Sequence, residues 1–132
     1  MTDKTKDVNT TALAYIGDAV YEIYIRKHCI EAGQYNVDTL HKRAVKFVRA
    51  DGQAFAVKTM MKEGFFTEEE LSLVKRARNH KSASKPKNAD PVIYKLATAF
   101  EALVGFLHLE GDIKRLEEVV NKAIAIIEEG EK

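Results

Sequence analysis

The sequence predicts an all-α fold, with about six main helices that form a single domain over residues 1–132. No stretch alternates apolar and polar residues with the period of two that marks a half-buried strand. Apolar residues instead recur at helical spacing, in segments separated by glycines and by residues that cap helices. The chain is long enough to bury one sizeable core, and its 45% hydrophobic residues and two prolines are typical of a folded domain.

Capping residues and helix breaks place the first three helices. Thr10 or Thr11 can cap the first helix, which we expect to end near residue 29, before the break at Gly33. The second helix is expected from residue 36 or 37 to about residue 48. The third is expected over residues 50–62, because Gly64 ends it.

The last three helices have clearer starts. Thr67 and Glu70, within "TEEE", are typical of a capping box, and the helix that they open is expected to reach about residue 79. Asp90 followed by Pro91 gives an N-cap and a proline at the first helical position, so a fifth helix is expected from there to about residue 109. Asp112 can cap the sixth helix, whose sequence "IKRLEEVVNKAIAII" is amphipathic.

Three features bear on the compartment. Residues 91–109 are the most apolar segment, but they include Lys95, Glu101 and His108, which favours a buried helix over a membrane span. The first eleven residues contain no apolar run that could act as a secretory signal. Cys29 is the only cysteine, which excludes an intrachain disulfide and a cysteine zinc cluster. We therefore expect a cytoplasmic protein that does not enter membranes.

The net charge of +1 hides a segregation of charge along the chain. Residues 41–87 carry 12 Lys or Arg against 5 Asp or Glu, whereas the segments on either side are acidic. Within this block, "KRARNHKSASKPKN" (75–88) holds six cations and no acid. An ordinary solvated loop could have this composition. A basic middle between acidic flanks favours a polyanion partner, because clustered Lys and Arg bind phosphates with release of counterions.

Two carboxylates lie in unusual positions. Asp18 is within the apolar helix "ALAYIGDAVYEIYIR", directly after Gly17, and Glu101 is the only acid in "PVIYKLATAFEALVGFLHL", four residues before Gly105. Glycine inside a helix costs about 0.5–1 kcal/mol relative to alanine, so it needs a reason such as the close approach of another backbone. If these two apolar helices cross near their glycines, Asp18 and Glu101 point into the same space.

Carboxylates brought together out of bulk water need a proton, a cationic side chain or a metal ion. One interpretation is a structural salt bridge to a nearby Lys or Arg, although Lys95 is the only cation on the fifth helix. The other is an oxygen-ligand site for Mg²⁺, which prefers carboxylate ligands. Beside a phosphate-binding surface, the second interpretation indicates metal-assisted phosphodiester chemistry.

At "YIGDAVYE" and "TAFEALVGFLHLE" the sequence resembles the catalytic domain of the ribonuclease III family. It is most similar to Mini-ribonuclease III, the short bacterial form without a separate double-stranded-RNA-binding domain, and the resemblance covers essentially the whole chain. It implies an all-α homodimer that cuts double-stranded RNA with Mg²⁺, with Asp18 and Glu101 as the metal-binding catalytic acids. Two further acids of the larger enzymes fall here on Ala14 and Thr98, which are not acidic. The aromatic residue of the family's dimer contact falls on Tyr15.

The expected function is therefore Mg²⁺-dependent cleavage of double-stranded RNA. The resemblance further implies maturation of the ends of large-subunit (23S) ribosomal RNA precursors, with a ribosomal protein as a candidate partner. The alternative is a non-catalytic helical RNA-binding module for ribosome assembly, in which the two acids serve only structure. The residues expected to hold the RNA duplex are those of the basic segment: Lys75, Arg76, Arg78, Asn79, Lys81, Lys85 and Lys87.

Overall fold

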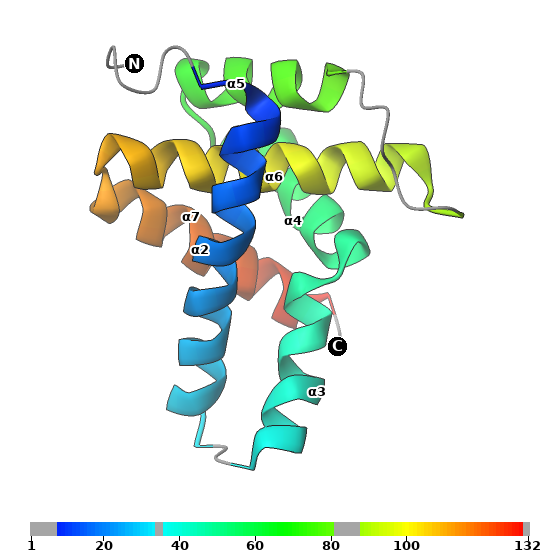
Figure 1. Cartoon of the computed structure of the whole chain (residues 1–132), viewed down its shortest axis with the longest axis vertical. Helices are drawn as coiled ribbons and strands as arrows, with labels where there is room; N and C mark the ends of the chain where they lie inside the picture. The colour runs from blue at the N-terminus through cyan, green and yellow to red at the C-terminus, as the bar shows by residue number, and fades with distance from the viewer. Residues whose placement is uncertain (1–7, 34–35, 81–87, 131–132) are drawn as a thin grey trace.

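Helix α6 (Pro91–Glu110) is the central element of the computed structural model, which describes residues 8–33, 36–80 and 88–130. Figure 1 shows it running across the molecule, with α2 crossing over it and the remaining helices grouped around it. The described part of the chain contains no strand, and the all-α prediction is confirmed. The other helices are α2 (Thr10–Glu31), α3 (Val37–Val48), α4 (Ala50–Lys62), α5 (Glu68–Asn79) and α7 (Ile113–Glu129).

A side-chain cap opens every described helix except α4, whose N-cap residue Arg49 makes no such hydrogen bond. Thr67 and Glu70 form both bonds of the predicted capping box, and the Asp90 and Asp112 side chains accept hydrogen bonds from the first turns of α6 and α7. The predicted cap of the first helix is wrong. Asn9, rather than Thr10 or Thr11, caps α2, since its Oδ1 accepts from the Ala12 amide at 2.8 Å.

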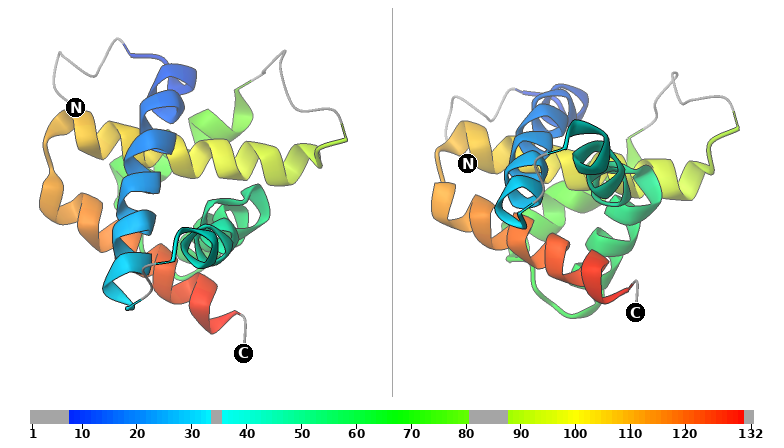
Figure 2. Two further views of the ribbon diagram at one scale, coloured as in Figure 1. Left: turned by 60° about the horizontal axis from the view of Figure 1, so that its bottom comes forward. Right: turned by 90° about the horizontal axis from the view of Figure 1, so that it is seen from below.

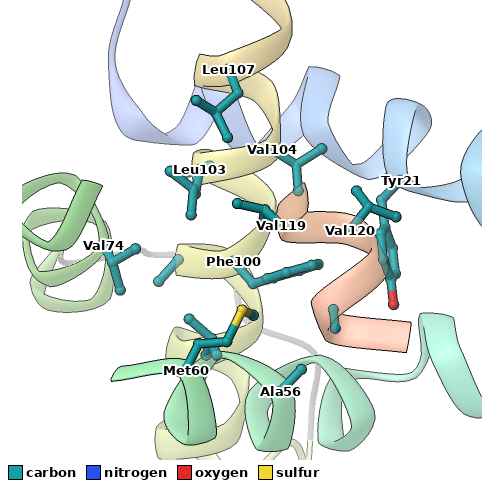
Figure 3. Close-up of a cluster of buried hydrophobic side chains, with 14 of the residues drawn as sticks. Tyr21, Ala56, Met60, Val74, Phe100, Leu103, Val104, Leu107, Val119 and Val120 are labelled. Carbon is teal, nitrogen blue, oxygen red and sulfur yellow. The ribbon is translucent and has the colours of Figure 1, made fainter. Parts of the chain in front are cut away.

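The core is built around α6 because most of its side chains between Leu96 and Leu107 are apolar and buried. It packs against α2, α4, α5 and α7, and Figure 3 shows its Phe100 near labelled side chains such as Tyr21 of α2, Met60 of α4 and Val120 of α7. By length and composition α6 could cross a membrane, yet it is the buried core helix that the sequence predicts. The labelled core residues in Figure 3 are Tyr21, Ala56, Met60, Val74, Phe100, Leu103, Val104, Leu107, Val119 and Val120.

Helix α2 is less buried than its sequence suggests. One face packs on α6, but Tyr15 is 84% exposed and Ile23 is 67% exposed on the opposite face. Asp18 is exposed as well. In Figure 2 the second half of α2 continues beyond α6 and lies beside α3. Within one copy of the chain, therefore, only part of the apolar surface of α2 is covered.

Candidate active site

Two glycines let α2 and α6 cross with their backbones in contact. A methyl group on Gly17 would overlap the carbonyl oxygen of Glu101, and one on Gly105 would overlap the carbonyl oxygen of Leu13. No other residue type fits at either position without moving a helix. The close approach predicted from the two glycines is confirmed, and it places Asp18, the residue after Gly17, beside Glu101.

Asp18 and Glu101 meet at one end of a cavity of ≈ 220 Å³. Their side chains lie next to each other, with Asp18 on the solvent side and Glu101 half-buried. Helix α2 provides one wall, α6 another, and the end of α5 closes the space. The remaining lining residues are Thr10, Thr11, Ala14, Tyr15, Ala77, His80, Pro91, Tyr94, Lys95 and Thr98.

The electrostatics of this pair are those of two acids without a balancing cation. Burial, and then the hydrogen bond and negative charge of Asp18, raise the pKa of Glu101 to about 8, and a hydrogen bond from Gln53 acts in the opposite direction. Among residues 8–33, 36–80 and 88–130, no Lys, Arg or His forms an ion pair with either acid. The described residues thus give no support to a structural salt bridge here.

A divalent cation suits this arrangement. It would balance the two negative charges and bind to carboxylate oxygens, which are the donors that Mg²⁺ prefers. In the described part of the chain, no group of three or more Asp, Glu, His or Cys side chains is arranged so that it could hold a metal ion. Asp18 and Glu101 would therefore be the protein ligands, and Mg²⁺ usually retains several water molecules at such a site.

The two positions at which the larger family members carry further acids face the same space. Ala14 and Thr98 both line the cavity, Ala14 from α2 and Thr98 from α6. The Thr98 hydroxyl donates to the carbonyl oxygen of Tyr94 at 2.9 Å, so this side chain is held by its own helix. The local geometry thus matches the resemblance, with a smaller acid set.

The basic segment begins at the rim of this cavity. Ala77 and His80 line the cavity at the end of α5, and Lys75 and Arg76 are exposed on the same two turns of helix. Arg78 is half-buried, and its Nε donates to the Asn79 side chain at 3.4 Å. The remaining three predicted RNA-binding residues lie outside the described residues: Lys81, Lys85 and Lys87.

Sequence reasoning missed three polar residues at or behind the site. His80 and Lys95 line the cavity, and Gln53 contacts Glu101 from α4. The histidine spacing gave no signal, since His80 reaches the cavity only through the packing of α5 on α6. A polar residue within the apolar run of the third predicted helix was the one available sign of Gln53.

Comparison with known proteins fits this geometry. The Ribonuclease III domain family matches residues 11–112. Mini-ribonuclease 3 of Enterococcus faecalis is 46% identical over 119 residues, which are 90% of each chain. Mini-ribonuclease 3 of Brevibacillus brevis is 46% identical over 127 residues, covering 94% of this chain and 93% of the relative.

A solved structure supports the same assignment. The crystal structure of a protein from Fusobacterium nucleatum superposes with a TM-score of 0.81 at 31% identity, covering 94% of this chain and 99% of that one. The fold, the family match and the relatives agree over nearly all of the chain. The chain therefore belongs to the ribonuclease III family and, within it, to the Mini-ribonuclease 3 proteins, and it is an endoribonuclease of the ribonuclease III type.

Proposed function

We propose that this endoribonuclease hydrolyses double-stranded RNA in a Mg²⁺-dependent reaction, and that its substrate is the precursor of large-subunit (23S) ribosomal RNA. The observation that carries the proposal is the pair formed by Asp18 and Glu101 in one cavity, next to the start of a basic segment. Family membership supports the reaction class. The ribosomal substrate is what the resemblance to the Mini form implies.

The carboxylates define the chemistry that the site can perform. Bound between Asp18 and Glu101, Mg²⁺ would polarise a phosphate and supply a nucleophilic water at neutral pH. Glu101 is shielded from solvent on the core side, which strengthens its interaction with any cation. The proposed reaction adds water across a phosphodiester, so the 3′ oxygen leaves with a proton and the fragment downstream of the cut carries a 5′ phosphate.

Basic side chains at the cavity can bind phosphates of the RNA backbone on either side of the scissile one. Lys95 is exposed on α6 one and a half turns before Glu101, and His80 follows α5 on the other side of the space. Phosphate oxygens are the groups that these side chains would bind. The basic segment that continues from His80 would extend this contact along the duplex. Contacts to phosphates and 2′-hydroxyls suffice, because A-form RNA hides its base edges.

A homodimer explains how one small domain cuts both strands. The exposed face of α2 includes Ala12, Tyr15, Ala19 and Ile23, which recur at helical spacing and leave an apolar stripe in water. Tyr15 also lines the cavity, so a partner on this stripe would lie next to the catalytic acids. Burial of the stripe against a second copy would give two sites for two strands.

The cellular setting is also part of the proposal. Ribosomal RNA precursors are substrates of the cytoplasm, and an RNA assembled with ribosomal proteins offers such a protein as a partner that presents the duplex. The basic middle of the chain, with 12 Lys or Arg against 5 Asp or Glu in residues 41–87, supports binding to RNA.

The substrate can be tested directly. The purified protein is incubated with Mg²⁺ and three RNAs: a precursor carrying the paired ends of the large-subunit RNA, an unrelated duplex of equal length, and a single strand. We expect cuts in both strands of the precursor stem, each with a 5′ phosphate, and none in the single strand. Binding of the duplexes without cleavage would contradict the proposal and favour a non-catalytic RNA-binding module.

A further inference from the structure

Gln53 is a buried polar residue behind the catalytic acids. It lies in the first turn of α4 and is 2% exposed, in the interface between α4 and α6. Its Nε2 donates to the carbonyl oxygen of Val48 at 3.0 Å, whereas its Oε1 is buried without a partner in the described structure. A buried, unpaired carbonyl oxygen is unfavourable, so a residue that only filled this space would be better apolar.

The end of α3 fixes the position of this amide. The last carbonyl groups of a helix have no partner within the helix. Here the carbonyl of Phe47 accepts from the Tyr21 hydroxyl at 2.9 Å, and the next carbonyl, that of Val48, accepts from Gln53. Tyr21 is edge-on to Phe100, the neighbour of Glu101 in the chain, at 4.9 Å between ring centroids. The last two carbonyl groups of α3 are therefore bound by side chains that lie near Glu101.

The second amide hydrogen of Gln53 is available to Glu101. A primary amide has two N–H donors in a fixed plane, and Val48 occupies one of them. The Gln53 amide lies next to the Glu101 carboxyl group, where α4 packs on α6, and favours its ionised form. An amide stabilises a carboxylate without adding a positive charge, whereas Lys or Arg at this position would neutralise the site.

We propose that Gln53 is a positioning residue that holds the Glu101 carboxylate in the orientation required to bind a metal ion opposite Asp18. This inference rests on the proposed Mg²⁺ site. The Val48 carbonyl anchors the amide, and the amide orients the acid. Hydrogen bonds of this kind to metal-binding carboxylates typically change metal affinity or activity by about 10- to 100-fold.

The test compares Mn²⁺ binding and RNA cleavage in Gln53→Met and the wild type. Methionine has a similar length and no donor. Mn²⁺ binding to the protein alone is measured by electron paramagnetic resonance, and kcat and KM are measured on duplex RNA. We expect Mn²⁺ affinity to fall about tenfold or more. The kcat should fall at low metal concentration and recover at high metal concentration, with KM for RNA unchanged. Wild-type Mn²⁺ affinity in Gln53→Met would overturn the inference.

Two further variants test whether a loss of Mn²⁺ affinity comes only from a general destabilisation of α4. Ala54→Gly weakens the same turn of α4 next to Gln53, and should lower the melting temperature with Mn²⁺ affinity unchanged. If Ala54→Gly lost as much Mn²⁺ affinity as Gln53→Met, the positioning role would be overturned. Gln53→Asn retains the amide on a shorter side chain, and it replaces Gln53→Met in the test if Gln53→Met does not fold. It too should bind Mn²⁺ more weakly, and unchanged affinity would overturn the inference.

Asp18→Asn separates this inference from the proposed function. If Asp18→Asn loses Mn²⁺ binding and Gln53→Met retains it, the metal site stands and the role of Gln53 is wrong. If Asp18→Asn binds Mn²⁺ as the wild type does, the proposed metal site itself is wrong, and the positioning role is wrong with it.

Discussion

Gly17 of α2 rests directly on the carbonyl oxygen of Glu101 in α6, with no room for a methyl group between the two helices. The residue that permits the crossing is thus the neighbour of one proposed catalytic acid, and the atom it touches belongs to the other. Gly105, one turn after Glu101, makes the reciprocal contact with Leu13. The distance between the two proposed metal ligands is consequently set by backbone packing.

Gly17→Ala should damage stability and activity together. The added methyl must push α2 away from α6, and overpacking of this kind costs about 1–3 kcal/mol, with this backbone contact expected at the upper end. Asp18 would move with α2, so cleavage should fall further than the fraction of folded protein. Urea denaturation and cleavage rates measure the two effects.

Gly130→Ala is the matched control, because the added methyl there meets mainly the flexible ring of Phe55 at 3.1 Å. It should be tolerated. Wild-type stability in Gly17→Ala would show that the helices are not held by this crossing.

Without metal, the protein should lose stability as pH rises. Burial and Asp18 raise the pKa of Glu101 from 4.5 to about 8, so the folded state holds a proton that the unfolded state has released between these values. Stability from this group is present at low pH and is lost as pH rises toward 8. Because Asp18 is open to water, we expect a loss of about 1–3 kcal/mol, below the full value for such a shift.

Glu101→Gln should remove this component. Melting temperatures in EDTA, taken between pH 5 and pH 8 for both proteins, give the difference. A variant whose pH dependence equals that of the wild type would mean that Glu101 is not perturbed as described.

Tyr15→Ala should weaken the proposed dimer. Tyr15 is 84% exposed in one copy of the chain, so its removal costs the monomer little, whereas an interface loses a large aromatic anchor. Cleavage should then depend more steeply on protein concentration. Sedimentation of Tyr15→Ala beside Ile113→Ala, an exposed apolar residue at the start of α7, tests this. An unchanged dimer in Tyr15→Ala would remove Tyr15 from the interface.

Replacing Lys81, Lys85 and Lys87 by alanine should raise KM for duplex RNA and leave the metal site intact. Each lost phosphate contact should reduce the log–log dependence of binding on salt by about 0.7–0.9, hence by about two to three for the three lysines. Titrations in Ca²⁺, chosen to suppress turnover, at several salt concentrations give the slopes. The control replaces three exposed lysines outside the basic segment, Lys58, Lys62 and Lys114. Identical slopes in the triple variant and the wild type would place the RNA elsewhere. The next candidate is α3 with the residue that follows it, which together carry Lys42, Arg43, Lys46 and Arg49.

Local chemistry predicted much of this molecule. Helix ends follow caps such as Asp90 and breaks such as Gly64, which act within a few residues and can therefore be read from the sequence. The meeting of Asp18 with Glu101 was also predictable, because an unfavourable glycine next to an acid in an apolar helix indicates a close crossing.

Other features depend on which helix faces pack against one another, and the sequence does not show this pairing of faces directly. Helix α2 is apolar almost all round, so periodicity could not indicate that the face with Tyr15 and Ile23 stays exposed. Gln53 contacts Glu101 only because the α3–α4 corner turns this part of α4 toward α6. Its role comes from three elements meeting at one point, and no single helix shows it.

The central claim is that Asp18 and Glu101 together hold the metal ion for cleavage. The most direct test is the rate of duplex RNA cleavage at increasing Mg²⁺ concentration for the wild type, Asp18→Asn, Glu101→Gln and the control Glu129→Gln, an exposed acid at the end of α7. The account predicts no cleavage in EDTA and Mg²⁺-dependent cleavage by the wild type and Glu129→Gln. It predicts no cleavage by either active-site variant at any Mg²⁺ concentration, although both remain folded and bind RNA. Wild-type rates in Asp18→Asn or Glu101→Gln, or cleavage by the wild type in EDTA, would contradict it.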